Sequence, residues 1–291
     1  MLRLNKKYKS WLFTTIKIVL SVLAIVYVLR KVPLTNVSGI LLSARTIFLI
    51  IALLLFVASK VAASFRTLLI LNRYSVFINW WSNLKLYWTG MFYNLFLPGS
   101  IGGDIYKTVV INRMHTGGIK ASAGAIIMDR VAGVLALTIL ALICMIFTSL
   151  YEKFYWVVFA GIPLVVLGFS GLIYFFTPEL KGLSGKLLAW SFLVQVLQVL
   201  SLIFILLSFG IDVLYPQYLL VFLISSIAAM LPLSIGGIGI RELVFYSLSE
   251  YFSLDQGVAV TISLTFFIIT AFSSLWGGIT ALEKDIPPAK I

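Results

Sequence analysis

The chain has 291 residues, of which 61% are apolar and only 11% are charged, and its net charge is +12. Soluble domains are closer to half apolar and about a quarter charged, so this composition excludes a soluble enzyme, a disordered chain, a coiled coil and a collagen-like fibre. One cysteine and one histidine argue against a disulfide framework and a Cys- or His-based metal site. We therefore expect an integral membrane protein without metal or cofactor, whose positive charge faces anionic lipid rather than nucleic acid.

Eight apolar segments follow one another along the chain. They are residues 11–29, 47–64, 80–97, 121–149, 154–176, 187–209, 217–231 and 254–282. Six are long enough to cross a hydrocarbon core of roughly 30 Å, but 80–97 is interrupted by polar residues and 217–231 is short. The first segment follows four basic residues and ends in Arg30-Lys31 rather than at a small-residue cleavage site, which indicates a retained span and not a signal peptide.

The two weaker segments end in nearly the same sequence. LPGSIGG occupies residues 97–103 and LPLSIGG occupies residues 231–237, so six of seven positions match. A basic residue, Lys107 or Arg241, stands nine positions after the proline of each copy. These matches fall at corresponding places in the order of segments, which indicates an internal duplication.

We therefore predict a single transmembrane domain over residues 1–291, with repeat one at 11–150 and repeat two at 154–283. If all eight segments cross, the loops carry nine Lys and Arg on each side of the membrane. If 80–97 and 217–231 instead enter and return on the same side, 13 lie inside and five outside, which the positive-inside rule prefers. The preferred fold is all-α and polytopic, with two inverted repeats, six crossing helices and two re-entrant Gly/Pro hairpins; eight full crossings is the alternative.

The two Gly/Pro motifs are suited to a helix reversal at membrane depth. Proline breaks the incoming helix, and the glycine pair permits a tight turn. Non-helical backbone in a membrane must be buried in protein or face a watery cavity, and the N-terminus of a following short helix (104–114 or 241–250) suits a phosphate. The alternative is that the glycines only permit close helix packing. The predicted hairpin backbone residues are Pro98, Gly99, Gly102, Gly103, Pro232, Gly236, Gly237 and Gly239.

Charged side chains inside apolar segments are costly, so they are candidates for function. Asp129 and Arg130 are adjacent and cannot face each other on a helix, so we expect Asp104 to pair with Arg130. Lys60 lies near a span end and is expected to extend to the interface. The charges either form structural ion pairs that hold the hairpins or build a basic site for an anionic head group. The candidate substrate-binding residues are Asn94, Asp104, Lys107, Asp129, Arg130, Arg241 and Glu242.

These motifs resemble the lysylphosphatidylglycerol synthase/flippase transmembrane-domain family of prokaryotic membrane proteins, over nearly the whole chain. The residues that carry the resemblance are 94–104, the Asp129-Arg130 pair and 231–242. Family members usually have arginine where Lys107 stands, so the charge is kept but a bidentate fork is lost. In the best-known members this domain is a lipid flippase, and a separate soluble domain transfers lysine onto phosphatidylglycerol. That soluble domain is not in this sequence, so the resemblance implies the translocating part; other relatives are linked to isoprenoid-linked sugars or hopanoids.

Two functions fit these observations. The first is movement of an anionic phospholipid or isoprenoid-phosphate lipid between leaflets, with no nucleotide-binding motif and no catalytic residue. The second is a membrane-embedded lipid-modifying enzyme or an accessory subunit of one, for which Asp104 and Glu242 are the candidate bases. The expected partners are lipids with anionic head groups and either a second copy of the chain or a separate lipid-modifying enzyme. We expect a prokaryotic plasma membrane, with both termini cytoplasmic.

Overall fold

A computed structural model describes residues 26–27, 39–96, 101–114, 118–231 and 236–282. Over these residues it is all-helical, which confirms the predicted fold class. The α-helices are α3 (Thr46–Arg73), α4 (Trp80–Phe96), α5 (Gly102–Met114), α6 (Gly118–Met145), α7 (Leu150–Phe176), α8 (Ser184–Ser208), α9 (Tyr215–Met230), α10 (Ile240–Tyr251) and α11 (Gln256–Leu282), with a 3-10 turn at Pro178–Leu180. The predicted span 11–29, apart from residues 26–27, and the motif residues Pro98, Gly99 and Pro232 lie outside the described residues.

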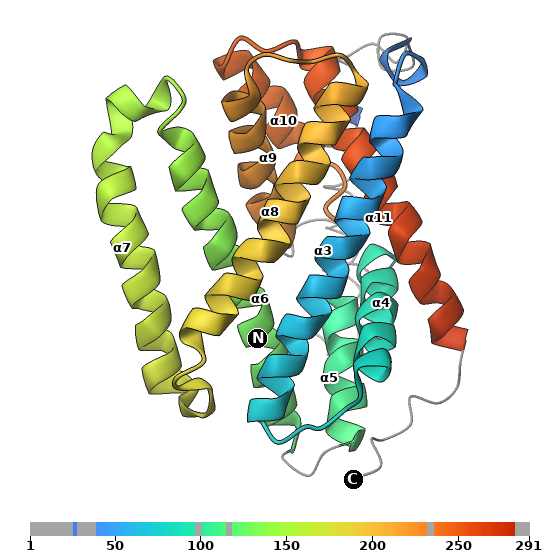
Figure 1. Cartoon of the computed structure of the whole chain (residues 1–291), viewed down its shortest axis with the longest axis vertical. Coiled ribbons are helices and arrows are strands. Elements are labelled where there is room, and N and C mark those ends of the chain that lie inside the picture. The colour runs from blue at the N-terminus through green and yellow to red at the C-terminus, as the bar shows by residue number, and fades with distance from the viewer. Residues whose placement is uncertain (1–25, 28–38, 97–100, 115–117, 232–235, 283–291) are drawn as a thin grey trace, which may run out of the picture.

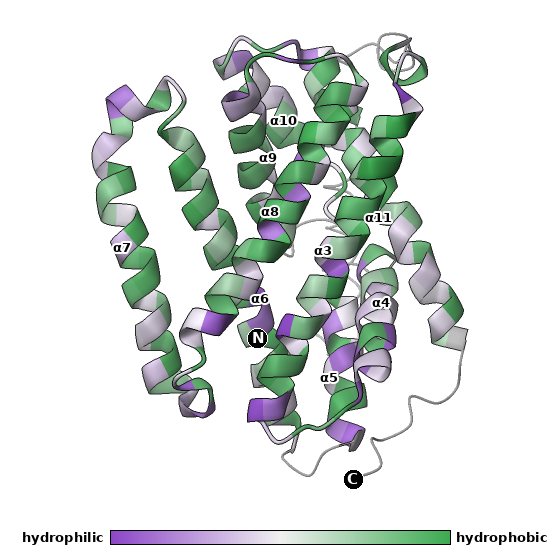
Figure 2. Ribbon diagram, in the orientation of Figure 1, coloured by the Kyte–Doolittle hydropathy of each residue, from purple (hydrophilic) through white to green (hydrophobic). Residues whose placement is uncertain are grey.

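Five of these helices are long and apolar enough to cross a membrane: α3, α6, α7, α8 and α11. Figure 2 shows that they are mainly hydrophobic along their length. In contrast, α4 has 17 residues and α9 has 16. At about 1.5 Å per residue neither reaches across a core of roughly 30 Å. The chain is thus a multi-pass membrane protein, and the lengths of α4 and α9 favour re-entry over full crossing.

The short helices form two hairpins that enter from opposite ends of the molecule. In Figure 1, α4 rises from the lower end and α5 returns to it, whereas α9 descends from the upper end and α10 returns there. Within each hairpin the two helices pack on each other. This is the arrangement expected of two re-entrant hairpins, while the inverted-repeat relationship of the two halves stays a prediction.

The long helices pack against both hairpins. The most extensive packing is between α3 and α8, and each hairpin's first helix packs on a long helix, α4 on α11 and α9 on α6. Two separate hydrophobic clusters result. One contains Phe56 of α3 with Phe222 and Phe266, and the other contains Ile70 of α3 with Ile111. Between Phe56 and Ile70, α3 contributes polar and charged residues, so a polar layer separates the two clusters.

Glycine permits the closest contact within the first hairpin. A Cβ atom added to Gly103 of α5 would lie 1.8 Å from the carbonyl oxygen of Gly90 on α4. Real side chains never approach a backbone oxygen so closely, so the α4–α5 crossing needs glycine at position 103. Gly102 and Gly103 are the first residues of α5, and Gly103 here permits close helix packing, which was the alternative role predicted from sequence.

We predict that Gly103→Ala lowers the melting temperature of the purified protein in detergent, because the added methyl group forces α4 and α5 apart. The cost corresponds to about 1–3 kcal/mol, as for overpacked cores. Gly171→Ala is the matched control, since nothing lies within 4 Å of its added Cβ. An equal melting temperature for the two variants would contradict this explanation of Gly103.

Candidate functional site

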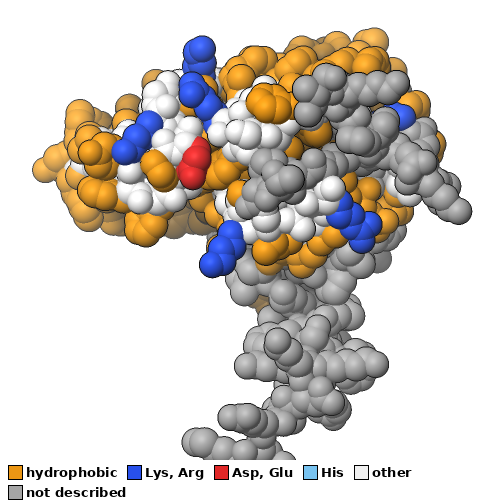
Figure 3. Space-filling view, turned by 90° about the horizontal axis from the view of Figure 1, so that it is seen from below, with side chains coloured by type: hydrophobic (Ala, Val, Ile, Leu, Met, Phe, Trp, Pro, Cys, Tyr) orange, Lys and Arg blue, Asp and Glu red, His pale blue; other side chains and the backbone are white. Residues whose placement is uncertain are grey.

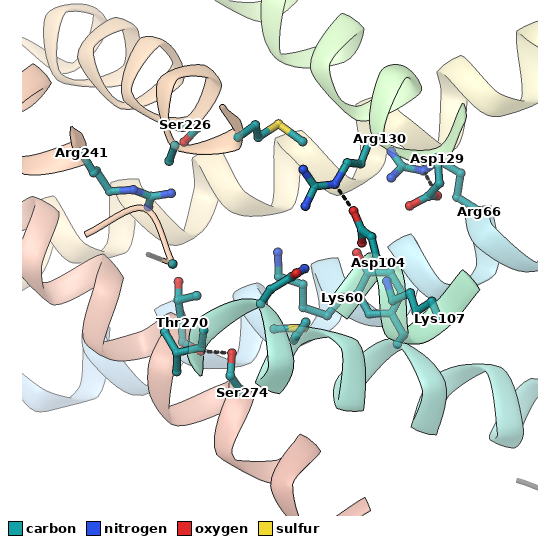
Figure 4. Close-up of a pocket in the computed structure, with 17 residues that line it drawn as sticks. Lys60, Arg66, Asp104, Lys107, Asp129, Arg130, Ser226, Arg241, Thr270 and Ser274 are labelled. Carbon is teal, nitrogen blue, oxygen red and sulfur yellow. Dashed lines mark hydrogen bonds and ion pairs between the residues drawn. The ribbon is translucent and has the colours of Figure 1, made fainter. Parts of the chain in front are cut away.

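A cavity of about 250 Å³ lies in the polar layer, where the two hairpins meet the long helices. Figure 4 shows its lining side chains converging from both hairpins and from α3, α6 and α11. The charged residues that line it are Lys60, Arg66, Asp104, Lys107, Asp129, Arg130 and Arg241. Five are basic and two are acidic, so the described part of the cavity wall carries an excess of three positive charges.

The first carboxylate, Asp129 of α6, is held in a buried network. Its Oδ1 accepts hydrogen bonds from Nε of Arg66 at 2.9 Å and from the hydroxyl of Thr67 at 3.1 Å. Nη1 of Arg66 donates to Oγ of Ser191 on α8 at 2.9 Å. Arg66 is 4% exposed and Asp129 7%. This network ties α3, α6 and α8 together at the depth of the cavity.

The second carboxylate, Asp104 of α5, forms an ion pair with Arg130 of α6. This contact confirms the pairing predicted from sequence. Arg130 is more accessible than its partner, with 28% of its side chain exposed against 13% for Asp104. The pair closes the α5–α6 side of the cavity.

Three cations remain whose charge no carboxylate in the described part of the chain balances through an ion pair: Lys60, Lys107 and Arg241. Each lies instead over an aromatic ring. The distances from charged group to ring centroid are 4.3 Å for Lys60 over Phe56, 3.9 Å for Lys107 over Tyr87 and 4.9 Å for Arg241 over Phe266. A ring face attracts a cation only weakly compared with a carboxylate or phosphate, so this wall favours an anionic ligand.

Lys107 reaches the cavity across α4. Its aliphatic chain passes over Gly90, where an added Cβ would lie 2.4 Å from Cε of Lys107. A larger residue at position 90 would displace the ammonium group. Sequence analysis placed Lys107 and Arg241 near each other, and the structure brings both to the wall of one cavity.

The backbone amides at the start of α5 are already engaged. The amide of Gly103 donates to Oδ1 of Asn94 at 2.8 Å, and the amide of Asp104 donates to the carbonyl of Ile101 at 3.0 Å. Asn94 also lines the cavity, so one side chain both accepts from the start of α5 and faces the candidate site. Sequence analysis expected such amides to bind phosphate; with these two occupied, side chains remain as the main donors.

The start of α10 is built differently. Gly236, Gly237 and Gly239 have positive φ angles of 60°, 84° and 86°, which L-residues with side chains rarely adopt. Here the glycines make the predicted tight reversal. Of these three, Gly236 also lines the cavity.

Glu242 does not line the cavity, unlike its neighbour Arg241. It is buried, and its two oxygens accept hydrogen bonds from the amide of Gly239 at 2.7 Å and the hydroxyl of Ser263 at 3.0 Å. Glu242 thereby caps α10 and attaches it to α11. Arg241 points the other way, into the cavity (Figure 4).

Two of the charged cavity residues, Lys60 and Arg66, were not found from sequence. Lys60 was expected to extend to the interface, and this was wrong: α3 runs over 28 residues, Thr46–Arg73, beyond the predicted 47–64, so Lys60 lies at mid-helix. Arg66 was assigned to a loop for the same reason. Continuing the helix through the apolar residues 68–71 would have placed both at membrane depth.

Comparison with known proteins agrees with this picture. The family model described as the lysylphosphatidylglycerol synthase TM region matches residues 14–184 and 184–277. The chain belongs to this family. It is also similar to a UPF0104 membrane protein of Pyrococcus horikoshii, with 21% identity over 321 residues that cover 92% of this chain and 96% of the relative.

We predict that Asp129→Ala destabilises the protein more than Asp104→Ala. Removing Asp129 leaves Arg66 buried without a counter-charge, at a cost of about 3–5 kcal/mol, whereas Arg130 is partly accessible. Melting temperatures in one detergent provide the comparison. The double variant Arg66→Met/Asp129→Leu should recover much of the loss, because it removes both buried charges; a double variant as unstable as Asp129→Ala would refute the ion-pair explanation.

Proposed function

We propose that this protein moves an anionic phospholipid, or an isoprenoid-phosphate-linked lipid, between the two leaflets of a membrane. The observation that carries the proposal is the central cavity with its three excess cations at the meeting point of two opposed hairpins. Membership of a lipid-related membrane family supports a lipid as the ligand.

In this mechanism the phosphate leaves the interface and is neutralised by Lys60, Lys107 and Arg241 while the hydrocarbon chains stay in the bilayer. An unpaired phosphate is very costly in a low-dielectric core, and cations already fixed at that depth lower this barrier. Because their present partners are aromatic rings, a phosphate displaces no carboxylate from these three residues.

The two hairpins would provide access from each side. We infer that they are inverted copies, and the packing supports this: exchanging the halves maps the contact of α4 with α11 onto that of α9 with α6, and leaves the contact of α3 with α8 unchanged. In such folds, substrate sites lie near the midplane between paired, broken helices. The equivalent bases Lys107 and Arg241 would then face the phosphate from the two sides.

The state of the carboxylates favours transport over lipid chemistry. Asp104 is paired with Arg130, and both oxygens of Glu242 accept hydrogen bonds. A catalytic base must reach the substrate proton, and Glu242 faces away from the cavity. Replacing Asp104 by Asn should therefore change the rate of translocation rather than abolish it.

We further propose that the lower end of Figure 1 faces the cytoplasm of a prokaryotic plasma membrane. Among the described residues, the exposed charged side chains at that end are Arg73, Arg113, Lys120, Glu179, Lys181 and Lys186, and Figure 3 shows more basic than acidic side chains on this face. Those at the upper end are Arg45, Glu152, Lys153, Asp212, Glu250 and Asp255. This excess of bases at one end follows the positive-inside rule.

The orientation predicts the reactivity of single cysteines introduced into a Cys144→Ala background. In intact cells, Lys153→Cys should react with a membrane-impermeant thiol reagent, and Lys186→Cys should react only after the membrane is permeabilised. Both positions are exposed, so burial does not confound the comparison. The reverse pattern would show that the protein has the opposite orientation in the membrane.

The transport proposal predicts the behaviour of purified protein in liposomes that contain fluorescent phosphatidylglycerol, with an impermeant quencher reporting leaflet exchange. Wild type should speed exchange. Lys107→Ala and Arg241→Ala should each slow it about tenfold or more, because a charged hydrogen bond of roughly 1.5–3 kcal/mol is lost. Lys107→Arg keeps the charge and should retain most of the rate.

The surface variant Lys186→Ala is the matched control, since it removes one positive charge far from the cavity and should leave exchange unchanged. If wild type fails to speed exchange of phosphatidylglycerol, lysyl-phosphatidylglycerol and polyprenyl phosphate, unpowered translocation is wrong. If Lys186→Ala slows exchange as much as Arg241→Ala does, the effect is one of net charge and not of the cavity.

A further inference from the structure

A second, apolar groove adjoins the charged cavity. It has a volume of about 450 Å³ and lies between α5 and the first half of α6. Its wall is apolar except at Asp104, Thr108 and Arg130. The volume is within the range of roughly 300–1,000 Å³ typical of pockets that hold small organic ligands.

The groove and the cavity share two residues, Asp104 and Arg130, which form an ion pair. On one side of this pair lie Lys60, Lys107 and Arg241, which form no ion pair with a described carboxylate, and on the other lie isoleucine and valine side chains. The two spaces are therefore adjacent, with a single ion pair at the boundary between them. A lipid with a phosphate at one end and a hydrocarbon chain at the other fits this arrangement, with the phosphate among the cations and the chain in the apolar groove.

The apolar side of the groove is open to the surroundings of the protein. Ile105 and Ile127 are each 59% exposed, and Ile119 is 51% exposed. The described end of the N-terminal region does not cover them: the ring of Tyr27 packs on Tyr246 of α10, in the opposite hairpin. In a bilayer these isoleucines face lipid, so a chain can enter sideways.

We propose that the α5–α6 groove binds a hydrocarbon chain of the lipid whose phosphate occupies the cationic cavity, with the Asp104–Arg130 pair at the junction of head group and chain. This inference deepens the proposed function and rests on it for the position of the phosphate. The groove opens in the lower half of the molecule, so the lipid enters from the leaflet at that end. Arg130, the more accessible partner, is placed to contact the entering phosphate.

The test is photolabelling of the reconstituted wild-type protein. The probe is phosphatidylglycerol with a diazirine midway along one acyl chain, diluted into phosphatidylcholine vesicles, and labelled residues are mapped by mass spectrometry. We expect adducts at Ile105, Val109 and Ile127 to exceed those at Leu164 and Leu167 of α7 about fivefold, which corresponds to a preference of roughly 1 kcal/mol. The α7 positions are a stringent reference, since they are 72% and 70% exposed.

Head-group dependence separates a binding groove from ordinary lipid contact. A phosphatidylcholine probe with the same chain should label the groove and α7 alike, and Lys107→Ala should reduce the phosphatidylglycerol preference. Uniform labelling by both probes, or a groove that no probe labels because another part of the chain covers it, would overturn the inference.

The groove and the proposed function can fail separately, because labelling measures occupancy and the quencher measures exchange. Selective labelling without leaflet exchange would support chain binding in the groove and contradict translocation. Leaflet exchange without selective labelling would support translocation and contradict chain binding in the groove. As a second variant, Ile127→Trp should fill the groove, lower selective labelling and slow exchange several-fold, whereas Leu164→Trp, a similar change on α7, should do neither; equal effects from the two would count against the groove.

Discussion

The structure depends on how positive charge is kept at the depth of a membrane. Among the described residues, five cations and two carboxylates line a small cavity between two hydrophobic clusters. The carboxylates serve Arg66 and Arg130, whereas Lys60, Lys107 and Arg241 are left with aromatic faces. Charges at such depth are expensive, so an arrangement that leaves three of them unbalanced lowers stability unless an anion is bound. That cost is the physical reason to regard the cavity as a binding site rather than as a set of structural ion pairs that hold the hairpins.

The lengths of α4 and α9 explain how basic residues are brought to this depth. Because α4 and α9 are too short to cross, each ends near the middle of the molecule, where α5 and α10 begin. Backbone amides at the starts of α5 and α10 are satisfied by different side chains: Asn94 accepts from Gly103 in the first hairpin, and Glu242 accepts from Gly239 in the second. In both cases the basic residue that follows, Lys107 or Arg241, is free of the capping task and faces the cavity.

Much of this could be predicted from sequence because it depends on local pattern. The apolar segments locate the helices, the two Gly/Pro motifs locate the hairpins, and the bases nine residues beyond each proline are two of the cavity's charged residues, Lys107 and Arg241. The Asp104–Arg130 pair followed from the rule that adjacent residues cannot face each other. Lys60, Arg66 and Ser191 could not be found in this way, because their positions depend on the full length of α3 and on its packing along α8. Glu242 was grouped with the cavity because sequence adjacency to Arg241 does not reveal which way a helical side chain points.

The two halves share one pair of equivalent bases and differ in their other charged residues. At the repeat offset of 134 residues, from Pro98 to Pro232, Lys107 corresponds to Arg241, but Asp104 and Arg130 correspond to Ile238 and Leu264. Asp129 corresponds to Ser263, which supports a buried charge in its own half by donating to Glu242. The equivalent bases give a phosphate similar partners from either hairpin, whereas the ion pair beside the apolar groove exists only in the first. The proposed lipid path is therefore not symmetric, and its asymmetry includes residues 104 and 130 but not the Gly/Pro motifs that the halves share.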